Sequence, residues 1–146
     1  MRQIAELLEG RPLFHAETNS NVRDVARYMS ERNIGAVAVL DAGKLVGVFS
    51  ERDVMSRVVA QGLDPDDTMV ENVMTKEIVV GEPNDNFDSA LQKMHGIGSR
   101  HLPIVTDGKL VGMISLRDLL EVDDQDQRRK ATFLSELVTY SPDYDS

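Results

Sequence analysis

Apolar residues recur along two segments of the chain at the spacing of one helix face. In each segment they occupy positions i, i+3, i+4 and i+7, which predicts an amphipathic α-helix. The residues are Val22, Val25, Ala26 and Met29 in the first segment and Phe87, Ala90, Leu91 and Met94 in the second. Asn21 and Asn86 stand directly before the two segments, and asparagine is a favoured N-cap residue. We therefore expect a helix to begin after each asparagine.

Each expected helix is followed by two apolar segments with a short turn between them. The first segment of each pair is almost continuously apolar, which is typical of a strand covered on both faces. The second follows a turn that contains glycine, which predicts a β-hairpin. A shorter apolar segment before each helix predicts one more strand. The expected strands cover residues 13–14, 36–40 and 45–49 in the first half and residues 78–80, 102–105 and 110–114 in the second.

Further helices are expected after the hairpins and at the two ends of the chain. The helices after the hairpins begin at Ser50 and Ser115, and Gly62 is a suitable C-terminal residue for the first of them. A helix near the N-terminus has Ile4, Leu7 and Leu8 on one face, and a helix over about 125–140 has Leu134, Leu137 and Val138 on one face. The fold class predicted from these patterns is α+β.

The two halves are an internal repeat with an offset of 65 residues. Residues 43–47 are identical to residues 108–112, and residues 13–54 match residues 78–119 at twelve of 42 positions without a gap. A β-α-β-β-α unit of about 50 to 60 residues is too small to bury a good core alone, so we expect the two to pack together. The predicted organisation is residues 1–62 for the N-terminal helix and first repeat, 63–75 for a linker, 76–122 for the second repeat and 123–146 for the C-terminal helix and tail.

Composition and charge exclude several classes of function. The chain has 146 residues, 41% of them hydrophobic, and its formal net charge is -9, which argues against nucleic-acid or membrane binding. It has no cysteine and therefore no disulfide, thiolate metal site or cysteine nucleophile. No apolar segment is long enough to span a bilayer. Because Glu6 and Glu9 interrupt the region where a secretory signal would be continuously apolar, we expect a cytoplasmic protein.

A Ser-x-x-Asp motif occurs at the strand-to-helix corner of both halves, as Ser50 with Asp53 and as Ser115 with Asp118. This is the pattern of a capping box, in which the two side chains satisfy backbone N–H groups at the start of a helix. A ligand site is the alternative. It is favoured by the repetition of the motif and by the glycine inside each preceding strand, since glycine weakens a strand unless something approaches the backbone closely.

The motifs together resemble the tandem cystathionine-β-synthase-type domain pair, the CBS pair or Bateman module, over about residues 10–122. The similarity lies in residues 34–39, 47–53, 73–75, 99–105 and 112–118. The resemblance implies a two-fold symmetric arrangement of the repeats with a central cleft for an adenosine ligand. AMP, ADP or ATP is expected, and NAD or S-adenosylmethionine is the alternative. It also implies a homodimer, which the apolar helix faces favour as well.

The resemblance implies that the serine and the aspartate of each corner contact the ligand, with the carboxylate accepting from the vicinal ribose hydroxyls. A carboxylate suits this task because it has only acceptors at neutral pH. Basic residues before the second core strand are the expected phosphate contacts, and residues near the first core strand are weaker adenine candidates. The candidate contacts are Thr18, Ile34, Gly35, Ala36, Ser50, Arg52, Asp53, Ser99, Arg100, His101, Pro103, Ser115, Arg117 and Asp118.

The number of ligands per chain stays open. Arg100 and His101 match Gly35 and Ala36, so the repeats are unequal, and one ligand per chain fits the pattern as well as two. No phosphate-binding glycine loop or metal-ligand spacing is recognisable, so we expect no enzymatic activity. His15 and His95 are interpreted as ordinary surface or packed residues. A protein-interaction scaffold with an empty cleft is the remaining alternative, and the protein partner is unknown.

Overall fold

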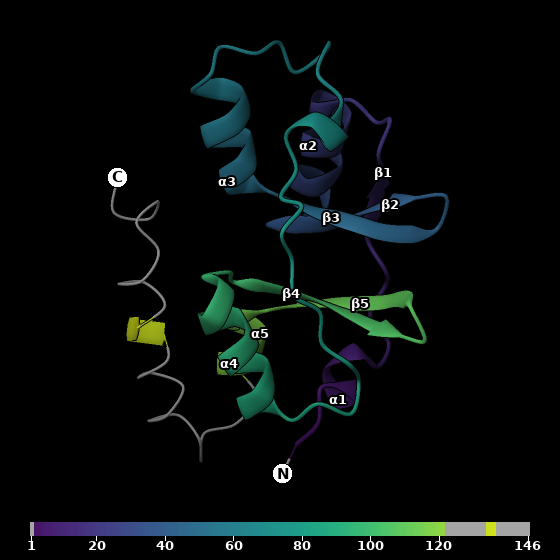
Figure 1. The fold of residues 1–146 in the computed structure, drawn as a ribbon, viewed down its shortest axis with the longest axis vertical. Coiled ribbons are helices and arrows are strands. Elements are labelled where there is room, and N and C mark those ends of the chain that lie inside the picture. The colour runs from purple at the N-terminus through teal and green to yellow at the C-terminus, as the bar shows by residue number, and fades with distance from the viewer. Residues whose placement is uncertain (1, 122–133, 137–146) are drawn as a thin grey trace. The chain divides into compact units, whose positions relative to one another are not determined.

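The computed structural model describes residues 2–121 and 134–136. They belong to two compact units. We call Phe14–Ile78 the first-repeat unit, and Met1–Leu13 together with Val79–Ser146 the second-repeat unit. The two units are coloured by residue number in Figure 1. Each unit combines helices with a small sheet, which confirms the predicted α+β class.

The first-repeat unit contains a three-stranded sheet with helices packed against it. Strand β2 is central, parallel to β1 and antiparallel to β3. The elements are β1 (His15–Glu17), α2 (Val22–Arg32), β2 (Ala36–Asp41), β3 (Lys44–Ser50), α3 (Glu51–Asp53), the π-helix η1 (Val54–Val59) and the 3₁₀-helix η2 (Val70–Asn72). Figure 1 shows α2 and α3 on the same side of this sheet. The strand expected at 13–14 begins two residues later, at His15.

The second-repeat unit repeats this arrangement with a two-stranded antiparallel sheet. Its elements are α1 (Ala5–Leu8), α4 (Phe87–Ile97), β4 (His101–Thr106), β5 (Lys109–Ser115) and α5 (Leu116–Leu120). The strand expected at 78–80 is absent among the described residues. In its place Gly81 forms an isolated parallel bridge with Ile104. The N–H of Gly81 donates to the carbonyl of Pro103, and the Gly81 carbonyl accepts from the N–H of Val105, each at 2.9 Å. The chain turns directly afterwards, where the N–H of Asp85 donates to the carbonyl of Glu82 at 3.0 Å.

Both predicted N-caps are confirmed. The side chain of Asn21 accepts from the N–H of Asp24, and the side chain of Asn86 accepts from the N–H of Ser89, each at 2.8 Å. These bonds satisfy N–H groups that have no partner within the helix. Gly62, with φ +71°, ends the helical region that begins at Ser50. Most of the helix expected over 125–140 lies outside the described residues; Leu134 within it is helical and packs against the second-repeat core.

Each core is completed by a segment that stands outside the contiguous repeat. In the first-repeat unit, Val70, Val73 and Met74 from the expected linker pack with Phe49. In the second-repeat unit, Ile4 and Leu7 from the N-terminal helix are buried in the core with Leu102, Ile104 and Ile114. The N-terminal helix, grouped by sequence with the first repeat, thus packs with the second. Backbone bonds from Ile4 to Asp85 and from Ala5 to Pro83, at 2.9 and 2.8 Å, hold it there.

Candidate functional site

The Ser50–Asp53 corner joins β3 to α3 in the first-repeat unit. The N–H of Asp53 donates to Ser50 Oγ at 3.3 Å, and the N–H of Ser50 donates to Asp53 Oδ2 at 2.9 Å. These two reciprocal bonds form a capping box. The Glu51 N–H donates to the carbonyl of Gly35 at 3.0 Å, which holds the corner against the start of β2. The capping interpretation of the motif is therefore confirmed here.

Asp53 is deeply buried, with 5% of its surface exposed. Thr75 Oγ1 lies 3.2 Å from Asp53 Oδ1 and 3.4 Å from Oδ2, and Arg57 Nε lies 3.8 Å from Oδ1. Burial raises the pKa of Asp53, and the N–H of Ser50 and the charge of Arg57 only partly offset this effect. Arg57 also donates to the carbonyls of Val73 and Met74, at 3.2 and 2.8 Å. Asp53 and Arg57 together hold residues 73–75 against the Ser50–Asp53 corner.

The Ser115–Asp118 corner in the second-repeat unit has the same capping box. The N–H of Ser115 donates to Asp118 Oδ2 at 2.7 Å, and the N–H of Asp118 donates to Ser115 Oγ at 3.1 Å. Arg11 Nη1 forms an ion pair with Asp118 Oδ2 at 3.0 Å. Burial would raise the pKa of Asp118, but the hydrogen bonds from Arg11 and Ser115 together outweigh burial, so this pKa is lowered. At neutral pH Asp118 is a partly exposed, ionised acceptor.

The structure places the candidate phosphate residues beside the second corner. The carbonyl of Arg100 accepts from the N–H of Leu116 at 2.8 Å, and His101 pairs with Ser115 across β4 and β5. The Oγ of Ser99 is 2.8 Å from the carbonyl of His101. Pro103 is buried within β4, and its carbonyl accepts from Gly81. In the first-repeat unit Ala36 pairs with Ser50 in the same register, so no basic residue occupies the corresponding positions.

The other candidates are more scattered. Thr18 is half-buried, and its N–H donates to the carbonyl of Leu40 at 3.1 Å. Arg52 is half-buried and Arg117 is exposed. No hydrogen bond among residues 2–121 and 134–136 joins Thr18 or Arg117 to a corner carboxylate.

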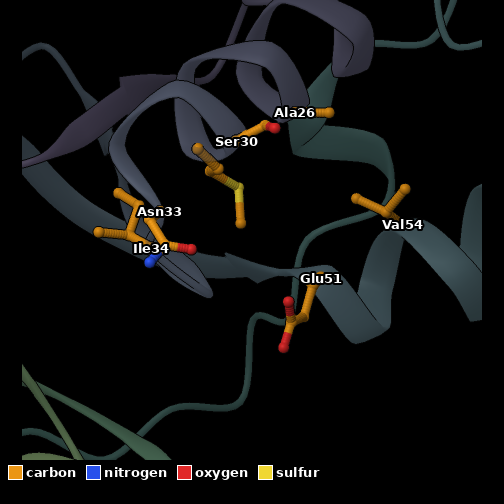
Figure 2. A pocket seen from close by; sticks show the side chains of 7 residues that line it. Ala26, Ser30, Asn33, Ile34, Glu51 and Val54 are labelled. Atoms are coloured by element: carbon orange, nitrogen blue, oxygen red, sulfur yellow. The ribbon is translucent and has the colours of Figure 1, made fainter.

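Ile34 lines a cavity of about 330 Å³ in the first-repeat unit (Figure 2). Figure 2 shows Ser30 and Asn33 on one side of this cavity and Glu51 and Val54 on the other. The lining residues are Ala26, Met29, Ser30, Asn33, Ile34, Glu51 and Val54. Ser50 and Asp53 are not among them, so the cavity adjoins the first corner without including its two motif side chains.

Sequence reasoning missed the partners of the two acids. Arg11 lies 107 positions from Asp118, and nothing in the local pattern links them. Thr75 lies 22 positions from Asp53, in the expected linker. The proximity of Arg57 to Asp53 could have been predicted from the sequence, since residues at i and i+4 are neighbours on a helix. Within the described part of the chain, no three His, Asp or Glu residues are grouped so that they could hold a metal ion.

The glycine inside each strand favoured a ligand in the sequence interpretation. In the structure, Gly47 and Gly112 are approached by other segments of the chain. A Cβ placed on Gly47 would lie 2.7 Å from Met74 Sδ, and one on Gly112 would lie 2.5 Å from Leu8 Cδ2. In both units the group that approaches the strand closely is therefore another segment of the same chain. The glycines are explained by internal packing.

The comparisons with known proteins identify the family. The CBS domain model matches residues 4–60 and 70–124, and the chain belongs to the CBS-domain family. The CBS domain-containing protein YhcV from Bacillus subtilis is 40% identical over 101 residues, which are 69% of this chain and 71% of YhcV. Across residues 2–121 and 134–136, no helix is both long and apolar enough to cross a membrane.

Two solved structures extend the similarity to the fold. A CBS-domain protein from Burkholderia ambifaria MC40-6 is 33% identical, with a TM-score of 0.79 over 86% of this chain and 96% of that one. The CBS domain protein PAE2072 from Pyrobaculum aerophilum, whose structure is a complex with AMP, is 30% identical, with a TM-score of 0.78 over 90% of this chain and 99% of that one. The chain is thus a pair of CBS repeats.

Proposed function

We propose that this chain is a regulatory module that binds an adenosine nucleotide, AMP, ADP or ATP, and signals through a partner protein or through self-association. The AMP complex of PAE2072 carries the proposal, because that protein shares 30% of its residues with this chain and is covered over 99% of its length. The ligand contacts predicted from the sequence stay predictions. Binding regulates only if the nucleotide has different affinity for two states of the module.

The corner chemistry supports this function. An ionised carboxylate accepts two hydroxyl hydrogens at once, which suits the vicinal diol of a ribose. His101 pairs with Ser115 in the sheet, and the carbonyl of Arg100 accepts from the N–H of Leu116. Both side chains can donate to phosphate oxygens, and a guanidinium presents its donors in a fork that fits two of them. The ligand is thus recognised by an acid at its sugar and by basic side chains at its phosphate.

Thermal melting of the whole chain against a ligand panel tests the proposal. The panel contains AMP, ADP, ATP, NAD and S-adenosylmethionine at millimolar concentration, with GMP as a matched control that keeps the ribose and the phosphate. A ligand that binds only the folded state adds about 2.7 kcal/mol at a hundred times its Kd. An adenine nucleotide is expected to raise the Tm more than GMP does. No shift with any ligand would favour the interaction scaffold, and a shift with NAD or S-adenosylmethionine alone would replace the nucleotide class.

We infer further that the module binds its ligand without turnover. Incubation of the protein with ATP, followed by mass spectrometry of the nucleotide, is expected to return ATP unchanged. Accumulation of ADP or AMP that depends on Asp118 would contradict this inference.

A homodimer is the second part of the proposal. Met55 and Val59 lie four residues apart on η1 and are 54% and 69% exposed, although both are large and apolar. A second copy of the chain that covers them would remove this surface from water. Light scattering at micromolar concentration is expected to give a dimer for the natural chain and a monomer for Val59→Glu. Gln92→Glu adds the same charge at an exposed position and should stay dimeric. A monomeric natural chain would contradict the proposal.

A further inference from the structure

We infer that the two Ser-x-x-Asp corners have different roles: Asp118 binds the adenosine ligand, Asp53 is a structural residue, and each chain therefore binds one ligand. This inference rests on the proposed function and adds to it the number and the location of the sites. It is carried by the contacts, exposure and neighbouring charges of the two carboxylates.

Both oxygens of the Asp53 carboxylate already have partners within the protein. Its Oδ2 accepts from the N–H of Ser50 at 2.9 Å, and Thr75 Oγ1 lies within 3.4 Å of both oxygens. Arg57 Nε stands 3.8 Å from Oδ1. Only 7% of the side chain is exposed. A ribose diol would have to displace the Thr75 hydroxyl from a carboxylate that is almost entirely buried. The backbone of Thr75 is bonded to Val48 at 2.8 and 3.0 Å, which keeps this residue beside Asp53.

The carboxylate of Asp118 keeps one oxygen available. The bonds from Ser115 at 2.7 Å and from Arg11 at 3.0 Å both end on Oδ2. Among the described residues, none donates a hydrogen bond to Oδ1. The side chain is 21% exposed, three times the exposure of Asp53. A diol can approach Oδ1 while Arg11 and the capping box stay in place. Because the pKa of Asp118 is lowered, the group is ionised, and an acceptor, at neutral pH.

The charges beside the two corners favour the same assignment. Arg100 and His101 adjoin the Ser115 corner, whereas the matching positions beside Ser50 are Gly35 and Ala36. Arg57, near Asp53, is bonded to two backbone carbonyls. The cavity next to the first corner, about 330 Å³ in volume, has the carboxylate of Glu51 and no basic residue in its lining. An anionic phosphate is therefore attracted to the second corner and repelled from the cavity at the first.

Isothermal titration of the full chain with AMP tests the inference through a matched pair of variants, Asp118→Asn and Asp53→Asn. The natural chain should bind one AMP per chain. Asp118→Asn should weaken binding about tenfold to a hundredfold, the range for a lost hydrogen bond to a charged group. Asp53→Asn should leave the Kd within about twofold, even where its Tm changes. If Asp53→Asn does not fold, Thr75→Val tests the same corner with a smaller change and should also leave the Kd unaltered.

The outcomes separate this inference from the proposed function. Two AMP molecules per chain, or weaker binding in Asp53→Asn or Thr75→Val with Asp118→Asn unchanged, would overturn the assignment while leaving nucleotide binding intact. No binding of AMP, ADP or ATP to the natural chain would overturn the proposed function and this inference with it. Binding that both acid variants weaken equally would show two equivalent corners and would also overturn it.

Discussion

Met74 occupies the space in which a side chain at Gly47 would stand. A Cβ on Gly47 would lie 2.7 Å from Met74 Sδ and 2.9 Å from the carbonyl oxygen of Thr75. The backbone of Thr75 cannot yield easily, because its N–H and its carbonyl both bond to Val48. At Gly112 the three nearest atoms all belong to the side chain of Leu8, which can change rotamer. The two glycines are equivalent in the repeat but differ in what surrounds them.

Gly47→Ala should therefore lower the free energy of unfolding by about 1–3 kcal/mol, the usual cost of an extra methyl group in a packed region. Gly112→Ala should cost less. Gly96→Ala is the matched control, because Gly96 lies in the exposed part of α4 with nothing within 4 Å of the added Cβ, and it should gain about 0.5–1 kcal/mol. Urea denaturation measures all three. Equal losses at Gly47 and Gly112 would contradict the distinction between backbone and side-chain neighbours.

Thr75→Val should destabilise the first-repeat unit by about 1–3 kcal/mol, because it removes the hydroxyl donor from a buried carboxylate and leaves the shape almost unchanged. Thr75→Ser keeps the hydroxyl and should restore most of the loss. Thr106→Val, at an exposed position of β4, is the control and should change the free energy of unfolding little. If valine at position 75 is tolerated as well as serine, Thr75 Oγ1 does not stabilise Asp53.

The elements that could be predicted from the sequence are those with a local cause. The two main helices follow from the 3.6-residue period of Val22 to Met29 and of Phe87 to Met94, and their N-caps follow from one asparagine each. The hairpins follow from apolar segments joined by short turns. These signals lie within a few residues of the structure that they specify, so no knowledge of tertiary packing was needed.

The packing of segments from outside each repeat could not be predicted in this way. The N-terminal helix was grouped with the repeat that follows it, yet Ile4 and Leu7 are buried in the core of the second-repeat unit. An apolar stripe states that a helix must pack, but it does not say against which of two similar sheets. The ion pair between Arg11 and Asp118 depends on the same long-range packing. No local pattern in the sequence therefore indicated that Arg11 contacts this candidate residue.

Asn86→Ala should lower the free energy of unfolding by about 1 kcal/mol, since the bond from the Ser89 N–H to the Asn86 side chain satisfies the start of α4. Asn86→Asp keeps the acceptor and should keep most of the stability. Asn72→Ala, at an exposed position in η2, is the control and should have little effect. Urea denaturation of the three variants measures these differences in the free energy of unfolding. A loss at Asn72 as large as that at Asn86 would show that the cap is not its cause.

The two corner acids should respond to pH in opposite directions. The folded-state pKa of Asp118 is lowered from its ordinary value of 3.8, so Asp118 contributes stability above that value and loses it as the pH falls through the folded pKa. The folded-state pKa of Asp53 is raised above 3.8, so its contribution is complete below that value and is lost as the pH rises through the folded pKa.

Urea denaturation between about pH 3 and pH 7 should show this difference when each acid is replaced by asparagine, which does not titrate. The stability advantage of the natural chain over Asp118→Asn should shrink on acidification. Its advantage over Asp53→Asn should grow, because acid protonates the buried carboxyl that neutral pH forces to ionise. Since each variant is compared with the natural chain at the same pH, the other titrating groups cancel to first order. Slopes of the same sign for the two variants would mean that burial does not distinguish Asp53 from Asp118.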